Sequence, residues 1–168
     1  AEAALRQTLA ETQTLYRVTR AAMASTELPT TLQNIANSLT DSLEASSLIL
    51  FILDLERSRI LRVITAPSND VLAQAHTLTF QGLMESLVGW VIQSRQAALS
   101  PAGQLDPRES PGVQDWRAAQ GGGCILAAPM VFHEQVQGAI VASRTSDQPD
   151  FTSGDIDLIS TLASQAAV

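Results

Sequence analysis

Two apolar runs in the C-terminal third of the chain are separated by a short polar break, which predicts a β-hairpin. Cys124 to Phe132 is almost wholly apolar, His133, Glu134 and Gln135 interrupt it, and Val136 to Ala142 resumes it. Strands with so little alternation of apolar and polar residues are usually covered on both faces. The hairpin is therefore expected in the middle of a sheet.

A second hairpin is predicted earlier in the chain, directly after a helix. Pro29 suits the first turn of that helix, and apolar residues continue at helical spacing as far as Glu44. Ser46 to Leu53 then forms a continuous apolar strand, Asp54 to Ser58 a charged turn, and Ile60 to Thr65 the partner strand. The helix is expected to pack on the resulting sheet.

The middle of the chain gives weaker signals. Leu72 to Phe80 has a poor strand pattern, Leu83 to Arg95 predicts a short amphipathic helix, and Ala97 to Ser100 predicts a brief strand. Ser100 to Gly112 then contains three prolines and two glycines, which predicts a loop with few buried contacts. Loops of this length are usually functional or disordered, and a short helix, Val113 to Gln120, follows this one.

A final helix is predicted after Phe151, with Thr152 or Ser153 as its N-cap. Its apolar stripe consists of Ile156, Ile159, Ala163 and Ala166, widened by Leu158 and Leu162. Strands and helices are thus clustered along the chain rather than regularly alternating. That order predicts the α+β class.

The N-terminal segment shows a weakly hydrophobic heptad seam. Its positions are Leu5, Leu9, Thr12, Tyr16, Thr19 and Met23. Two interpretations stay open: an amphipathic helix on its own domain, or a helix that pairs with its copy in a dimer. We expect an N-terminal helix over residues 1–24 and one domain over residues 25–168, together a module of a longer protein.

Composition excludes several classes of protein. A net charge of −7 would repel a phosphate backbone, which argues against nucleic-acid binding. The apolar runs are much shorter than the ~20 residues that a membrane-spanning helix needs. Cys124 is the single cysteine, so no intrachain disulfide or cysteine-rich zinc site is possible, and a cytoplasmic location is expected. Cys124 itself is expected to be a small buried apolar residue.

No catalytic motif is present. Gly121 to Gly123 is the only glycine run, and no Lys-Ser or Lys-Thr pair follows it, so nucleotide hydrolysis is not supported. There is no G-x-S-x-G motif, and the two histidines, His76 and His133, are expected in solvent. Several carboxylates in turns and loops are also expected to be solvated, namely Asp54, Glu56, Asp106 and Glu109. The sequence predicts neither an enzyme nor a metal site.

Four segments together carry a family pattern over residues 28–168. They are LPTTLQNIANSLTDSLEASSLILFILD, SLVGWVIQSRQAAL, CILAAPMVFHEQVQGAIVAS and DFTSGDIDLISTLASQAAV. In this order they resemble a GAF domain, the small-ligand and chromophore-sensing module of many signalling proteins. The resemblance implies a central antiparallel sheet of five or six strands, with the terminal helices on one face and a ligand pocket on the other.

The resemblance also implies where a ligand would lie. The pocket is expected under the segments Ser100 to Gly112 and Val113 to Gln120, with the strand from Leu48 to Leu53 in its floor. The candidate ligand-binding residues are Phe51, Ser100, Asp106 and Trp116. For Trp116 the alternative is a core anchor, because indoles bury large areas with or without a ligand.

Several activities of the family lack their residues here. Bilin-binding members attach the chromophore through a Cys-His pair where this chain has Pro111, Gly112 and Val113, so no covalent bilin is expected. The methionine-sulfoxide reductase cycle needs more than one cysteine. Haem could be bound only through His76, which makes haem an unfavoured cofactor.

Cyclic-nucleotide-binding members share an Asn-Lys pair, a Phe and an Asp-Glu pair. Only Phe151 and Asp155 match, while Ser143, Arg144 and Ile156 differ, so cyclic-nucleotide binding is not expected. The sequence predicts a sensory module of a larger bacterial signalling protein that binds a small molecule noncovalently and signals through its terminal helices as a homodimer. The alternative is a structural dimerisation module that binds no ligand and spaces the input and output domains.

Overall fold

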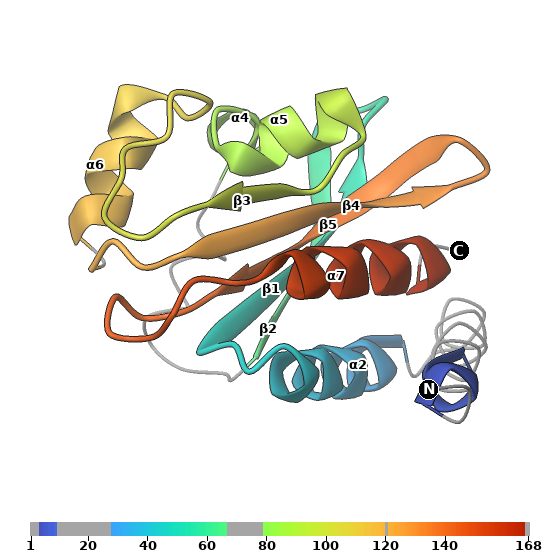
Figure 1. The fold of residues 1–168 in the computed structure, drawn as a ribbon. Coiled ribbons are helices and arrows are strands. Elements are labelled where there is room, and N and C mark those ends of the chain that lie inside the picture. The colour runs from blue at the N-terminus through green and yellow to red at the C-terminus, as the bar shows by residue number, and fades with distance from the viewer. Residues whose placement is uncertain (1–3, 10–27, 67–78, 120, 167–168) are drawn as a thin grey trace.

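The computed structural model describes residues 4–9, 28–66, 79–119 and 121–166. Five antiparallel strands form one sheet in the order β2-β1-β5-β4-β3, with helices on both sides (Figure 1). The strands are β1 (Ser47–Asp54), β2 (Arg59–Ala66), β3 (Ala98–Ser100), β4 (Ile125–Phe132) and β5 (Gln135–Ser143). The predicted α+β architecture is confirmed, and five strands are found within the described residues.

Both predicted hairpins are present, and the second occupies the middle of the sheet as expected. β4 also pairs with β3, and β5 also pairs with β1, so neither strand is at an edge. The two strands are joined through His133 and Glu134, whose φ angles are 49° and 65°. Two consecutive positive φ angles give the turn geometry that matches the right-handed twist of the joined strands.

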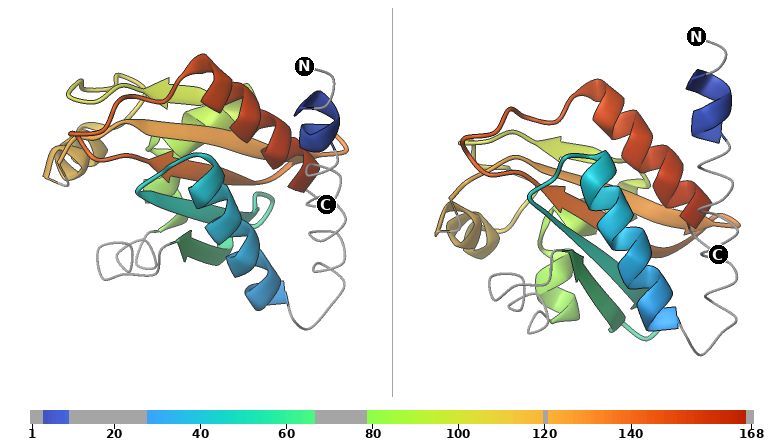
Figure 2. Two further views of the ribbon diagram at one scale, coloured as in Figure 1. Left: turned by 60° about the horizontal axis from the view of Figure 1, so that its bottom comes forward. Right: turned by 90° about the horizontal axis from the view of Figure 1, so that it is seen from below.

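Helices α2 (Leu28–Ser42) and α7 (Ser153–Ala166) cover one face of the sheet. α2 lies over β1 and β2 and α7 over β4 and β5 (Figure 2), which confirms that the terminal helices share one face. Of the two candidate caps of α7, Thr152 accepts the Asp155 N–H at 3.3 Å, and the Asp155 carboxylate accepts the Thr152 N–H at 2.8 Å. The helical residues buried in this core are Leu32, Ile35, Ala36, Leu39, Ile159, Leu162 and Ala163, and Leu43, just past the end of α2, is buried with them.

The opposite face is covered by two short helices where the sequence predicted one. These are α4 (Phe80–Met84) and α5 (Leu87–Ser94). The Ser86 hydroxyl accepts the Val88 N–H at 3.2 Å and so begins a new helix, as serine N-caps do. The prediction of a single helix from Leu83 was wrong because this cap interrupts it, although Arg95 does end α5 in the left-handed conformation.

The segment from β3 to β4 extends beyond the sheet. It contains α6 (Pro111–Ala119), which begins two residues before the predicted start at Val113 and lies past the end of the sheet in every view (Figures 1 and 2). Arg117 is the only residue of α6 that is buried. This helix is therefore attached to the domain through a charged side chain, whereas α2 and α7 are attached through apolar stripes.

Arg144, directly after β5, ties the ends of α2 and α7 together. Its guanidinium donates to the carbonyl oxygens of Leu43 at 2.8 Å and Pro149 at 3.1 Å. It also lies 4.2 Å from the centre of the Phe151 ring and 3.9 Å from the Asp155 carboxylate. This buried arginine satisfies a carbonyl group just past the C-terminal end of α2 and fixes the start of α7 beside it.

Two sequence predictions concern regions that the structure covers only in part. Residues 4–9 are helical, and Leu5 and Leu9 are 70% and 56% exposed, while the remaining seam positions and the boundary at residue 24 lie outside the described residues. The weak strand from Leu72 and the histidine His76 also lie outside them. No helix among the described residues is long and apolar enough to cross a membrane.

Replacement of Gly138 by alanine is expected to destabilise the domain. A Cβ at this position of β5 would lie 1.9 Å from the carbonyl oxygen of Phe51, so β1 and β5 would have to move apart. We expect a loss of about 2 kcal/mol or more in the free energy of unfolding, measured by urea denaturation. The control is Gly112→Ala in α6, where a Cβ meets no atom within 4 Å. Equal stability of the two variants would contradict this explanation.

Candidate functional site

The loop between β3 and α6 is fastened at two points, first through Asp106 and Arg108. The Asp106 carboxylate accepts hydrogen bonds from Arg108 Nε at 2.9 Å and from Nη2 at 2.7 Å. Arg108 Nη2 also donates to the Leu99 carbonyl oxygen at 2.9 Å, and the guanidinium lies 5.0 Å from the centre of the Trp90 ring. The bidentate ion pair orients Arg108 within the loop, and Arg108 joins the loop to β3 by the hydrogen bond to Leu99 and to α5 by the cation–π contact with Trp90.

The second point is an ion pair between Glu109 and Arg117, whose side chains are only 3% and 9% exposed. Arg117 Nη1 donates to Glu109 Oε1 and, at 2.8 Å, to the Ser100 hydroxyl. Arg117 Nη2 donates to the Gly123 carbonyl oxygen at 3.4 Å, and Glu109 Oε2 accepts the Leu87 N–H at 3.3 Å. One ion pair therefore joins β3, α5, α6 and the residue that leads into β4.

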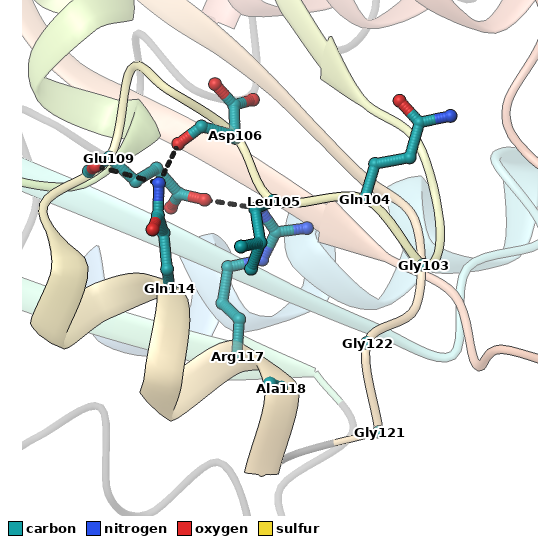
Figure 3. Close-up of a pocket in the computed structure, with 10 residues that line it drawn as sticks. All are labelled: Gly103, Gln104, Leu105, Asp106, Glu109, Gln114, Arg117, Ala118, Gly121 and Gly122. Atoms are coloured by element: carbon teal, nitrogen blue, oxygen red, sulfur yellow. Dashed lines mark hydrogen bonds and ion pairs between the residues drawn. The ribbon is translucent and has the colours of Figure 1, made fainter.

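A hollow of about 250 Å³ lies between this loop and α6 (Figure 3). Across it, Gln114 Nε2 donates to the carbonyl oxygens of Asp106 at 2.6 Å and Glu109 at 3.3 Å. Its lining residues are Gly103, Gln104, Leu105, Asp106, Glu109, Gln114, Arg117, Ala118, Gly121 and Gly122. The hollow combines buried charges, an amide and backbone, so it suits a small polar molecule better than an apolar one.

A second hollow of about 270 Å³ adjoins the same loop. It shares Gln104, Leu105 and Asp106 with the first and adds Ser100 and Arg108. The segment that the sequence singled out as a functional loop therefore forms the whole lining of the second hollow and half of the lining of the first.

The family model for the GAF domain matches residues 25–168. The chain belongs to the GAF domain family. A comparison with curated proteins found no match.

Three solved structures illustrate the similarity. The GAF domain of a phosphoenolpyruvate-protein phosphotransferase from Acinetobacter is 21% identical over 92% of this chain and 88% of that chain, with a TM-score of 0.67. A GAF domain/HD domain protein from Geobacter sulfurreducens is 19% identical over 81% and 87%, with a TM-score of 0.64. Free methionine-R-sulfoxide reductase from Neisseria meningitidis is 12% identical over 91% and 83%, with a TM-score of 0.63. At these identities the likeness extends to the fold alone.

The structure of this GAF domain brings together two of the four predicted ligand-binding residues. Ser100 and Asp106 both line the second hollow, and Asp106 lines the first as well. Phe51 is 2% exposed and packs under α4 and α5 with Leu83 and Val88. Trp116, 48% exposed, lines neither hollow, and its alternative role as a core anchor is wrong. A ligand-binding role for the four residues stays a prediction.

Two carboxylates expected in solvent are instead buried. Asp106 and Glu109 each have an arginine partner, and these pairs contradict the expectation that the loop makes few buried contacts. Sequence reasoning also missed Arg117, which follows Glu109 by eight residues across the start of a helix. A usable signal was the density of charges between residues 106 and 117 in a chain with only 16% charged residues.

The structure also places the residues considered for other activities of GAF domains. Pro111 and Gly112 begin α6 at the position where bilin-binding members have their Cys-His pair. Cys124 lies in the apolar core, as expected, and burial raises the pKa of its thiol. Arg144, Phe151 and Asp155, at positions of the cyclic-nucleotide motif, contact one another rather than either hollow. Within the described ranges, no three His, Cys, Asp or Glu side chains gather as metal ligands.

The Asp106–Arg108 pair predicts a loss of stability in acid. The hydrogen bond from the Arg108 side chain lowers the pKa of Asp106 from 3.8 to about 2. Because the folded pKa lies below the unfolded one, the stabilisation is present above pH 3.8 and is lost as the pH falls to about 2. Asp106→Asn should lower the free energy of unfolding at pH 7 by ~2 kcal/mol and flatten its pH dependence in this window.

Urea denaturation between pH 2 and 7 tests this expectation. The control is Asp41→Asn, at an exposed position of α2, which should retain the pH profile of the unmodified chain. An Asp106→Asn profile as steep as that of the unmodified chain would show that another group is responsible.

Proposed function

We propose that this GAF domain is a sensory module of a larger bacterial signalling protein, that it binds a small polar molecule noncovalently, and that it signals through its terminal helices. The observation that carries the proposal is the hollow between the loop and α6, whose wall includes the Glu109–Arg117 pair. The hollow lies past the end of the sheet, next to α6, and α7 packs on β4, so the shortest path from the hollow to the terminal helices runs through the start of β4 (Figure 1).

A role without catalysis fits the chemistry of the described residues better. Asp106 and Glu109 are each engaged by an arginine, which leaves neither carboxylate in the hollow as an unpaired acid or base. The Cys124 thiol is buried and its pKa is raised, opposite to the requirement for a nucleophile. Its reduced, buried state also suits the cytoplasm. A relative of the same fold is an enzyme, so these side chains carry the argument rather than the fold.

The second candidate function is a structural dimerisation module without a ligand, which spaces other domains. The observation in its favour is the exposure of Leu5 and Leu9 on the N-terminal helical segment. Two leucines four residues apart lie on the same side of a helix and form the kind of seam that pairs with another helix. Dimerisation is compatible with both candidate functions, whereas ligand binding belongs to the first alone.

Native mass spectrometry of the gently purified chain tests ligand binding. We expect a bound mass of a few hundred daltons that is lost on denaturation. Ala118→Trp should abolish it, because Ala118 is an exposed α6 residue that lines the hollow and an indole there would fill the space. Ala119→Trp is the matched control, since Ala119 is the next exposed residue of α6 and does not line the hollow.

Two results would contradict a ligand in this hollow. One is a spectrum of the unmodified protein that shows only the mass of the chain without a ligand, which would favour the structural module. The other is a bound mass that persists in Ala118→Trp, which would place the ligand elsewhere.

The homodimer is tested by charge repulsion at the proposed seam. Changing both Leu5 and Leu9 to glutamate should convert a dimer into a folded monomer, because like charges would face each other across a symmetric interface. Light scattering measures the mass, and circular dichroism checks the fold. Leu61→Glu on β2 is the control, since this leucine is 54% exposed and far from residues 4–9 in sequence. A double variant that remains a dimer would exclude this interface.

A further inference from the structure

Residues 101–119 differ from the rest of the domain in how they are held. We call them the lid, which consists of the loop after β3 together with α6. Every other helix of eight or more described residues contributes buried apolar side chains to the core clusters. In α6 the single buried residue is Arg117, and Trp116 beside it is exposed. Apolar burial therefore contributes little to closing the lid.

The bonds that close the lid converge on a few polar atoms. Glu109 accepts the Leu87 N–H, Arg117 donates to the Ser100 hydroxyl, and the Ser110 N–H donates to the Glu85 carbonyl oxygen at 2.9 Å. The Gly103 N–H donates to the Gly122 carbonyl oxygen at 2.9 Å, which holds the two ends of the lid segment together. Such bonds can be exchanged for bonds to water, and breaking them does not expose the apolar core.

The lid closes over one end of a row of side chains on the sheet. Ser100 pairs with Ile125, Ile125 with Ser143, and Ser143 with Ser47, so the four side chains share one face across β3, β4, β5 and β1. This face is the one covered by α4 and α5, because Val141, two residues before Ser143, packs there. Ser100 is 1% exposed, and Arg117 is its hydrogen-bond partner. Lifting α6 would therefore uncover this end of the row.

The geometry points to a latched lid: residues 101–119 open as a unit while the sheet stays folded. The Glu109–Arg117 ion pair is the latch that holds the α6 end closed, and the contacts of Arg108 with Leu99 and Trp90 are a second fastening of the loop. Opening separates Glu109 from the N-terminal end of α5 and gives water access to Ser100. An unlatched α6 also frays, since a nine-residue helix is marginal without tertiary contacts. Opening is a property of the ligand-free chain, so it can be measured whether or not a ligand is found.

Amide hydrogen exchange followed by NMR tests the latch in the full chain. The Leu87 and Ser110 amides report on the lid, because their acceptors are Glu109 and Glu85 across its boundary. The amides of β5 report on the sheet. A local opening exposes little surface, so lid amides should exchange at a rate that low urea does not change, while β5 exchange accelerates with urea. Equal urea dependence of the two groups would overturn the proposal.

Arg117→Met is the decisive variant, since it removes the charge and keeps a long side chain. We expect at least tenfold faster exchange of the lid amides with β5 exchange little changed, and partial recovery in Arg117→Lys. Arg57→Met, at a 75% exposed arginine of the first hairpin, is the matched control and should change neither group. Equal acceleration of lid and β5 amides would mean that Arg117 stabilises the whole domain and is not a latch. If Arg117→Met fails to fold, the urea dependence of amide exchange in the unmodified chain and the exchange rates of Arg117→Lys still test the latch.

Discussion

The Glu109–Arg117 ion pair joins α6, which buries no apolar side chain, to β3, α5 and the residue that leads into β4. Removing two charges from water is costly, and only further hydrogen bonds and close geometry offset that cost. Here the Ser100 hydroxyl, the Leu87 N–H and the Gly123 carbonyl oxygen provide them. Because of that cost, a buried pair of this kind adds little net stability, yet loss of one partner is strongly destabilising since the other charge stays buried and unpaired.

The two faces of the sheet therefore rely on different forces. Beneath α2 and α7, large aliphatic side chains are fully buried, and Arg144 fixes the ends of both helices by bonds to backbone carbonyl oxygens. At the end of the other face, the lid depends on charge pairs that hydrate readily when separated. Displacing the lid therefore costs less free energy than displacing α2 or α7. The lid is thus the part of the domain expected to open at the lowest free energy, while α2 and α7 open only with the core.

Much of the fold could be predicted because it follows from short-range patterns. Each hairpin is recognisable from two largely apolar runs on either side of a polar break, and α2 and α7 are recognisable from apolar residues at helical spacing. The end of α4 before Ser86 was missed because a serine within an amphipathic pattern can lie inside a helix or cap a new one. The sequence pattern does not distinguish these cases, and in the structure Ser86 is the N-cap of α5. The buried charges could not be predicted from periodicity at all. Glu109 precedes α6 and Arg117 lies within it, and their contact depends on how the loop before α6 is held against α5, which neither loop length nor composition specifies.

Family membership does not identify the ligand-binding residues of this chain either, because these too depend on local contacts. The family model matches residues 25–168 as a whole, which establishes the family and not the residues that would bind a ligand. The hollow is built from the loop and α6, whose backbone is fixed by this chain's own ion pairs. Even the positions of Arg144, Phe151 and Asp155 serve here to join α7 to α2. The identity of a ligand must therefore be sought in the charges and the dimensions of the hollow itself.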